Sequence, residues 1–148
     1  MGWSFVSYKE RDVQLRDDVI IIIMAALKHR IPADCPSERV ARMLAEWPAR
    51  GCHAGPGCID AGLDEALVDL IDVASFSQGL NELETMFLSD PKSATKERLN
   101  AVLEDFPIVT ADRDREELAD ACNRLKSILG ADATDRQSAS RAGARTYH

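Results

Sequence analysis

Four cysteine and histidine side chains could bind a metal ion. They are Cys35, Cys52, His53 and Cys58. Thiolate sulfur and imidazole nitrogen are ligands that zinc prefers, and structural zinc sites usually take them in close pairs with about two to four residues between them. Five residues separate Cys52 from Cys58, and Cys35 has no close mate. The spacing therefore predicts no metal and no cofactor, and a zinc- or redox-responsive regulator that uses these residues is kept as the alternative function.

Carboxylates form a second set of residues that could do chemistry or bind a partner. Between Gly51 and Pro91 the chain has eight acidic residues and no lysine or arginine. Residues 1–50 hold eight basic and seven acidic side chains, and residues 92–148 hold ten of each, so the net charge of −7 comes from this acidic segment. An excess of one sign attracts cationic partners and repels nucleic acid and acidic membranes. We therefore expect a basic protein partner, no nucleic acid and no membrane.

The spacing of the acids indicates where that partner would bind. Glu65, Asp69 and Asp72 occupy positions i, i+4 and i+7 of a predicted helix, opposite its apolar stripe. Like charges at such spacing repel by roughly 0.2–0.5 kcal/mol per pair, so tolerating several of them suggests a use. The predicted partner-binding residues are Asp60, Asp64, Glu65, Asp69, Asp72, Glu82 and Glu84.

The usual reaction motifs are absent from the sequence. A carboxylate that acts as a general acid or base needs a pKa raised by burial or by a close neighbour, and these carboxylates are predicted to face solvent. The glycine-rich stretch Gly55–Cys58 precedes a predicted helix but lacks the lysine of a P-loop, and no G-x-S-x-G elbow occurs. We therefore predict no catalytic residues and no enzyme activity; carboxylates that converge from different helices would make an enzyme a further open class.

The elements that position these residues are predicted to be almost entirely helical. Trp3–Tyr8 is expected to be a short extended start. Four consecutive isoleucines, Ile20–Ile23, also suit a buried strand, but the good helix formers that follow them favour a helix. Ser37 and Thr110 are the predicted N-caps of two helices. Apolar periodicity predicts helices over about 11–29, 37–47, 63–74, 80–87, 91–106 and 111–129, the third and fourth of these being separate or one kinked helix.

These elements predict an all-α fold, a single-domain bundle of five to six helices with short loops. The helical domain is predicted to span 1–130, and the small, polar residues 131–148 to form a disordered tail. The longest apolar run, Val19–Leu27, has about half the length that a bilayer-spanning helix needs, and we expect a cytoplasmic protein. The function that fits best is a non-catalytic acidic protein that binds and neutralises or regulates a basic protein, as an immunity protein, antitoxin or inhibitor does.

Overall fold

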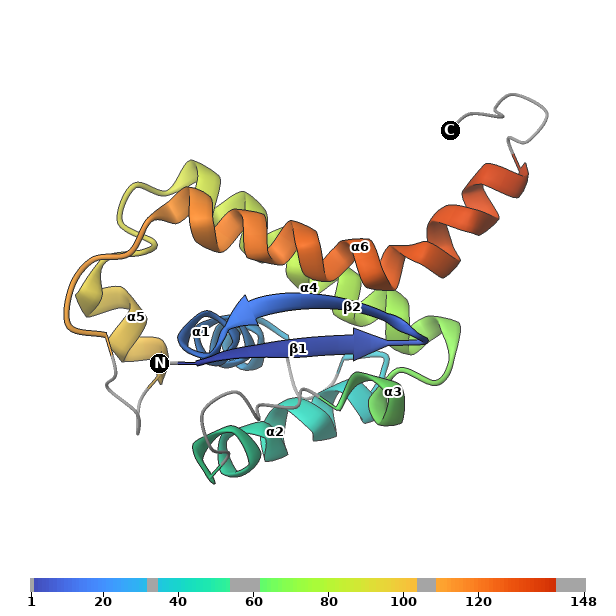
Figure 1. Cartoon of the computed structure of the whole chain (residues 1–148), viewed down its shortest axis with the longest axis horizontal. Coiled ribbons are helices and arrows are strands. Elements are labelled where there is room, and N and C mark those ends of the chain that lie inside the picture. The colour runs from blue at the N-terminus through green and yellow to red at the C-terminus, as the bar shows by residue number, and fades with distance from the viewer. Residues whose placement is uncertain (1, 32–34, 54–61, 104–108, 141–148) are drawn as a thin grey trace.

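The computed structural model describes residues 2–31, 35–53, 62–103 and 109–140, without the side chains of 48–53 and 130–140. The elements in chain order are β1 (Trp3–Tyr8), β2 (Arg11–Arg16), α1 (Asp17–Arg30), α2 (Glu38–His53), α3 (Leu63–Ala66), α4 (Leu70–Ser89), α5 (Lys96–Leu103) and α6 (Arg115–Ser140). Helices α4 and α6 lie side by side, and the two strands lie between α6 and the pair α2 and α3 in the view of Figure 1.

The all-α prediction is wrong, because the chain begins with an antiparallel β-hairpin. β1 pairs with β2 in a register that runs from Trp3 opposite Arg16 to Tyr8 opposite Arg11. The segment 11–16 alternates apolar Val13 and Leu15, both buried, with polar neighbours, which is the period of a strand and not of a helix. The predicted extended start is β1, whereas the first helix begins at Asp17 and not near Arg11. The fold is mostly helical with a two-stranded sheet.

A two-residue turn closes the hairpin. Lys9 and Glu10 both have positive φ, 49° and 67°, as a type I′ turn requires. The turn is fixed to the helical part, because the Lys9 backbone N–H donates to Asp64 Oδ1 at 2.9 Å.

The predicted third helix is divided into two. α3 ends at Ala66, and α4 begins at Leu70 with Asp69 as its N-cap. The possible break between the predicted helices 63–74 and 80–87 falls on Ser75–Gly79, a stretch whose residues weaken a helix, but this stretch lies inside α4 without interruption. The helix is therefore broken, but several residues before Gly79. The position of the break is set by Asp69, the N-cap of α4.

Other helix ends also differ from the sequence prediction. Helix α2 continues past Pro48 to His53, and α5 begins at Lys96 because the residues after Pro91 form turns. The backbone of α6 continues past Gly130 to Ser140. The domain boundary at residue 130 stays a prediction, and residues 141–148 of the predicted tail lie outside the described residues.

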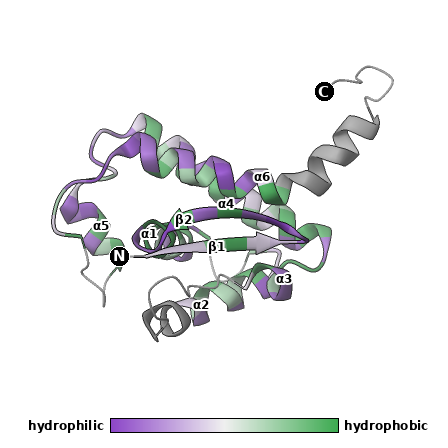
Figure 2. Cartoon of the chain, in the orientation of Figure 1, coloured by the Kyte–Doolittle hydropathy of each residue, from purple (hydrophilic) through white to green (hydrophobic). Residues whose placement is uncertain are grey.

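The hydrophobic core is centred on α1. As its all-round apolar pattern predicts, Ile20, Ile22, Ile23 and Leu27 are almost completely buried. The same core takes side chains from the hairpin and from the other helices, and Figure 2 shows hydrophobic and hydrophilic residues interspersed along β1 and α6. No described helix is long and apolar enough to cross a membrane.

A partly buried ion pair connects the N-terminal third to the segment before α6. Arg113 Nη1 lies 2.5 Å from Asp18 Oδ2, and Arg16 Nη2 lies 3.0 Å from the same oxygen. Burial alone raises the pKa of Asp18, but the hydrogen bonds and charges of Arg113 and Arg16 outweigh burial and hold the pKa below its ordinary value. The carboxylate is therefore a charged link between α1 and the chain that enters α6.

Candidate functional site

Cations from other elements neutralise much of the acidic segment. Within the described residues, Arg39 of α2 pairs with Asp69 and Asp72 at 2.8 and 3.1 Å, and Arg30 of α1 approaches Glu82 at 3.5 Å. Lys126 of α6 contacts Glu84. The segment has no cation of its own, yet the fold supplies cations from the balanced flanking segments. Basic residues are therefore missing from the acidic segment of the sequence, but they lie next to its carboxylates in the folded chain.

Asp72 has a structural role in this arrangement. Its carboxylate is 2 % exposed and accepts hydrogen bonds from the Ser37 hydroxyl at 2.6 Å and from the backbone N–H of Asp69 at 2.8 Å and Val68 at 3.1 Å. Ser37 in turn accepts from the Val40 backbone N–H at 3.0 Å, which confirms it as the N-cap of α2. Asp72 thus connects the first turns of α2 and α4.

The charge of Asp72 is maintained by these donors. Burial raises the pKa of its carboxyl, but the hydrogen bonds from the backbone, from Ser37 and from Arg39 lower it by more, so that the pKa lies below its ordinary value. The predicted arrangement of Glu65, Asp69 and Asp72 on one exposed helix face is wrong. Glu65 is exposed on α3, Asp69 precedes α4, and Asp72 is inside α4 facing α2.

The remaining predicted partner-binding acids that the structure describes lie on two elements, α3 and α4. Asp64 of α3 accepts from the hairpin turn, and Glu82 and Glu84 lie on α4 facing α1 and α6 respectively. Asp60 lies outside the described residues. Whether any of these side chains binds a partner stays a prediction.

Three large apolar side chains are half exposed where α3 meets α4. The exposed fractions are 55 % for Val68, 54 % for Leu70 and 48 % for Ile71. The apolar stripe of the helix predicted over 63–74 includes Leu70 and Ile71 at i, i+3, i+4 spacing and so predicts that both are buried. The break after α3 instead leaves them exposed. With the neighbouring acids Asp64, Glu65 and Asp69 they form what we call the junction surface.

The signal that could have located this surface was present in the sequence. An acidic N-cap followed three residues later by a second acid is close to the capping-box pattern, and Asp69 and Asp72 have this spacing. Reading Asp69 as a helix start, and not as one position of a charged stripe, would have separated α3 from α4.

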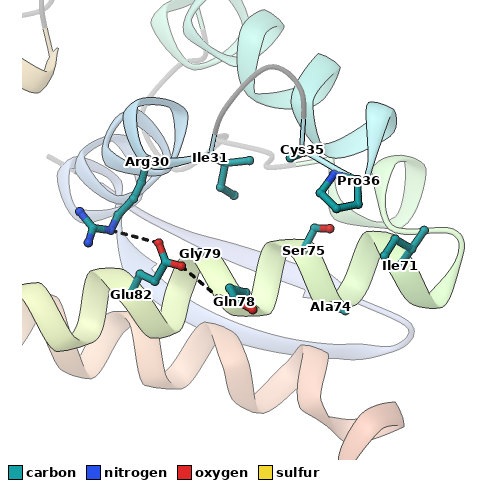
Figure 3. Close-up of a pocket in the computed structure, with 10 residues that line it drawn as sticks. All are labelled: Arg30, Ile31, Cys35, Pro36, Ile71, Ala74, Ser75, Gln78, Gly79 and Glu82. Carbon is teal, nitrogen blue, oxygen red and sulfur yellow. Dashed lines mark hydrogen bonds and ion pairs between the residues drawn. The ribbon is translucent and has the colours of Figure 1, made fainter.

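A groove of about 460 Å³ continues the junction surface along α4. Ile71 lies at one end of the groove and the Arg30–Glu82 pair at the other, with Ile31, Pro36 and Ala74 along it (Figure 3). Gly79 also lines it; a Cβ at this position would lie 2.7 Å from Ile31 Cδ1, so the missing side chain lets the end of α1 approach α4. The groove is therefore mainly apolar with a charged end.

The cysteines do not form a metal site in the part of the chain that the structure describes. Cys35 lines the groove and its thiol donates to the Ser37 carbonyl at 3.0 Å. Cys52 and His53 lie on α2 with undescribed side chains, and Cys58 lies outside the described residues. Among described residues no group of three or more His, Cys, Asp or Glu side chains could hold a metal ion. Burial raises the pKa of Cys122 to about 12, so this thiol stays protonated at neutral pH.

Comparisons with protein-family models, with curated proteins and with solved structures find no match to this chain.

Proposed function

We propose that this protein is a non-catalytic binding protein that holds a basic protein partner at the junction surface. The observation that carries the proposal is the group of half-exposed apolar side chains Val68, Leu70 and Ile71, of which Ile71 lines an apolar groove. Single exposed apolar residues are ordinary, but contiguous ones next to a concave surface are typical of interaction sites. These side chains are the anchors in the proposed complex.

The anchors are held on a fixed backbone. The hydrogen bonds among Ser37, Asp72 and the Val68 and Asp69 backbone groups set the angle between α2 and the start of α4. Side chains on a preorganised backbone lose less conformational entropy on binding, which favours affinity. The network therefore supports binding even though its members are not the contact residues.

The surrounding charge selects a basic partner. Asp64 and Glu65 are exposed, and the Asp69 side chain keeps 63 % of its surface accessible although it pairs with Arg39. Exposed charges at the rim of an interface mainly accelerate association and fix orientation, whereas the apolar centre sets the lifetime. We therefore expect a partner with an apolar patch surrounded by lysine and arginine, and an inhibitor of a basic enzyme, such as an immunity protein or antitoxin, fits this description.

The test uses the immobilised full chain as bait for lysate proteins, with substitutions matched in exposure. Ile71→Lys introduces a charge at the junction surface, and Leu88→Lys introduces the same charge at the other end of α4, where Leu88 is 55 % exposed. We expect one basic protein to be retained by the wild type and by Leu88→Lys, with at least about tenfold weaker binding to Ile71→Lys. Retention should also fall as salt rises from about 0.05 to 0.5 M, because exposed charges are screened.

Two results would contradict the proposal. The first is equal loss with Ile71→Lys and Leu88→Lys, which would show a general effect of charge. The second is binding that survives Ile71→Lys, which would place the interface elsewhere.

A further inference from the structure

The outer edge of β1 carries backbone groups that have no partner among the described residues. In an antiparallel pair, opposite residues alternate between those that exchange hydrogen bonds and those that do not. The Asp17 N–H donates to the Gly2 carbonyl at 3.0 Å, so Gly2 and Asp17 form a hydrogen-bonded pair. In this register the next hydrogen-bonded pairs are Ser4 with Leu15 and Val6 with Val13. The intervening residues Trp3, Phe5 and Ser7 therefore direct their N–H and C=O groups away from β2, and no described residue hydrogen-bonds with them.

The two strands of the hairpin differ in protection against further pairing. Natural edge strands are usually protected by charged side chains, by proline or by a covering element. β2 carries Arg11, Asp12 and Arg16, and α6 packs against it (Figure 1). β1 has no charged residue, no proline and no glycine in its sequence WSFVSY. Among the described elements α3 and α6 also contact β1, so the two strands differ in residue type: β1 lacks the residue types that usually protect an edge.

The outer face of the same strand is aromatic. Trp3 is 53 % exposed and Phe5 is 59 % exposed, and their cross-strand neighbours are Arg16 and Gln14. Large aromatic rings at this exposure are a strong drive for association because they bury extensive area. The outward backbone groups and the exposed rings therefore coincide at two of the three alternate residues, Trp3 and Phe5.

We infer that β1 pairs with β1 of a second copy of this chain, antiparallel and about a twofold axis at Phe5. Only residues with outward backbone groups can bond across the new edge, so Phe5 lies opposite Phe5 of the second copy and Trp3 opposite its Ser7. This register uses the outward groups of all three residues in each copy. The result is a four-stranded sheet in which the Trp3 and Phe5 rings of both copies form one cluster.

Charge favours a second copy as the occupant. A strand of the same sequence brings no charge to the edge. In the paired sheet the row that contains Arg16 of one copy ends at Asp12 of the other, so the nearest charges in one row have opposite signs. The acidic segment that gives the net charge lies outside the hairpin. A twofold contact of this kind is closed, so it yields a dimer and not a fibre.

The test is the molar mass in solution, which needs no partner and is independent of the proposed function. Sedimentation of the full chain from about 1 to 500 µM should show the mass doubling with concentration, as a reversible dimer requires. Phe5→Lys places two lysines opposite each other across the axis and should raise the dissociation constant at least tenfold. Gln14→Lys adds the same charge to the same face one strand further away and should leave the dimer largely intact.

A second substitution tests the backbone pairing directly. Ser7→Pro removes an N–H that points outward, which edge strands tolerate, so the fold measured by circular dichroism should persist while the dimer dissociates. A wild type that stays monomeric throughout the range overturns the inference. A dimer that survives both Phe5→Lys and Ser7→Pro also overturns it, as does equal dissociation by Gln14→Lys.

Discussion

Asp72 is the residue on which the arrangement of α2 and α4 depends. Its buried carboxylate accepts from two backbone N–H groups and from Ser37, and its charge is balanced by Arg39. Removing such an acceptor leaves buried donors without a partner and removes the support of a helix N-terminus. A residue predicted to contact a partner is therefore required for the scaffold.

The substitution Asp72→Asn should lower the free energy of unfolding at pH 7 by about 2 kcal/mol, because the amide cannot accept from all of these donors. The folded-state pKa of Asp72 is lowered, so its contribution is complete above the unfolded value of about 3.9 and is lost as pH falls through the lower folded value. The difference between wild type and variant should therefore shrink in that acid range. Urea titrations at a series of pH values measure it.

The control for this prediction is Glu116→Gln, which removes an exposed carboxylate in the first turn of α6. We expect this change to alter stability by less than about 0.5 kcal/mol. An Asp72→Asn penalty no larger than the control, or one that is constant with pH, would disprove the structural role.

At the scale of elements, the hairpin turn carries avoidable strain. Lys9 and Glu10 adopt positive φ angles that disfavour residues with a Cβ, whereas Asn-Gly suits a type I′ turn. Replacing the pair by Lys9→Asn and Glu10→Gly should raise the free energy of unfolding by about 0.5–1 kcal/mol. The bond from the residue 9 N–H to Asp64 is kept because it is a backbone bond.

Chemical denaturation of the turn variant measures the gain, with Gln14→Gly as the comparison. Glycine inside β2 should instead lower stability by about 0.5–1 kcal/mol. Destabilisation by the Asn-Gly turn would contradict a type I′ turn at Lys9 and Glu10.

The elements predicted correctly are those whose signal is local. The extended start at Trp3–Tyr8, the buried α1 and the cap at Ser37 each follow from a pattern within a few residues. Segment 11–16 was misassigned because its two apolar residues fit either a strand or the start of a long apolar helix. Only pairing with β1 and packing against the core settle that choice, and both depend on distant contacts.

The candidate site was predicted less well for the same reason. The acidic segment was located correctly as a charge feature, but its surroundings depend on Arg30, Arg39 and Lys126, which are remote in sequence. A single helical period across 63–74 also concealed the exposed position of Ile71. Sequence periodicity assigns faces only where the helix is continuous.

At the scale of the whole molecule, the hairpin and helices share one hydrophobic core. Val6, Tyr8, Val13 and Leu15 of the hairpin belong to the same cluster as the α1 residues. We therefore expect one cooperative unfolding transition. In Trp3→Phe the remaining tryptophan is the buried Trp47 of α2, so its fluorescence should change at the same urea concentration as the helical circular dichroism signal.

Two separate transitions would contradict a common core. The control is Leu88→Lys, which replaces an exposed apolar residue far from the hairpin. In this variant the fluorescence and circular dichroism transitions should still coincide.

The ion pair between Asp18 and Arg113 has a consequence for biosynthesis. The two residues are 95 positions apart, and Arg113 lies shortly before α6, the helix that packs against the hairpin. A ribosome releases the hairpin and α1 first, while α6 is still untranslated. The hairpin and the charged Asp18 therefore have no contact with α6 and Arg113 until the last described helix has been synthesised. The chain cannot complete its core in the order in which it is synthesised.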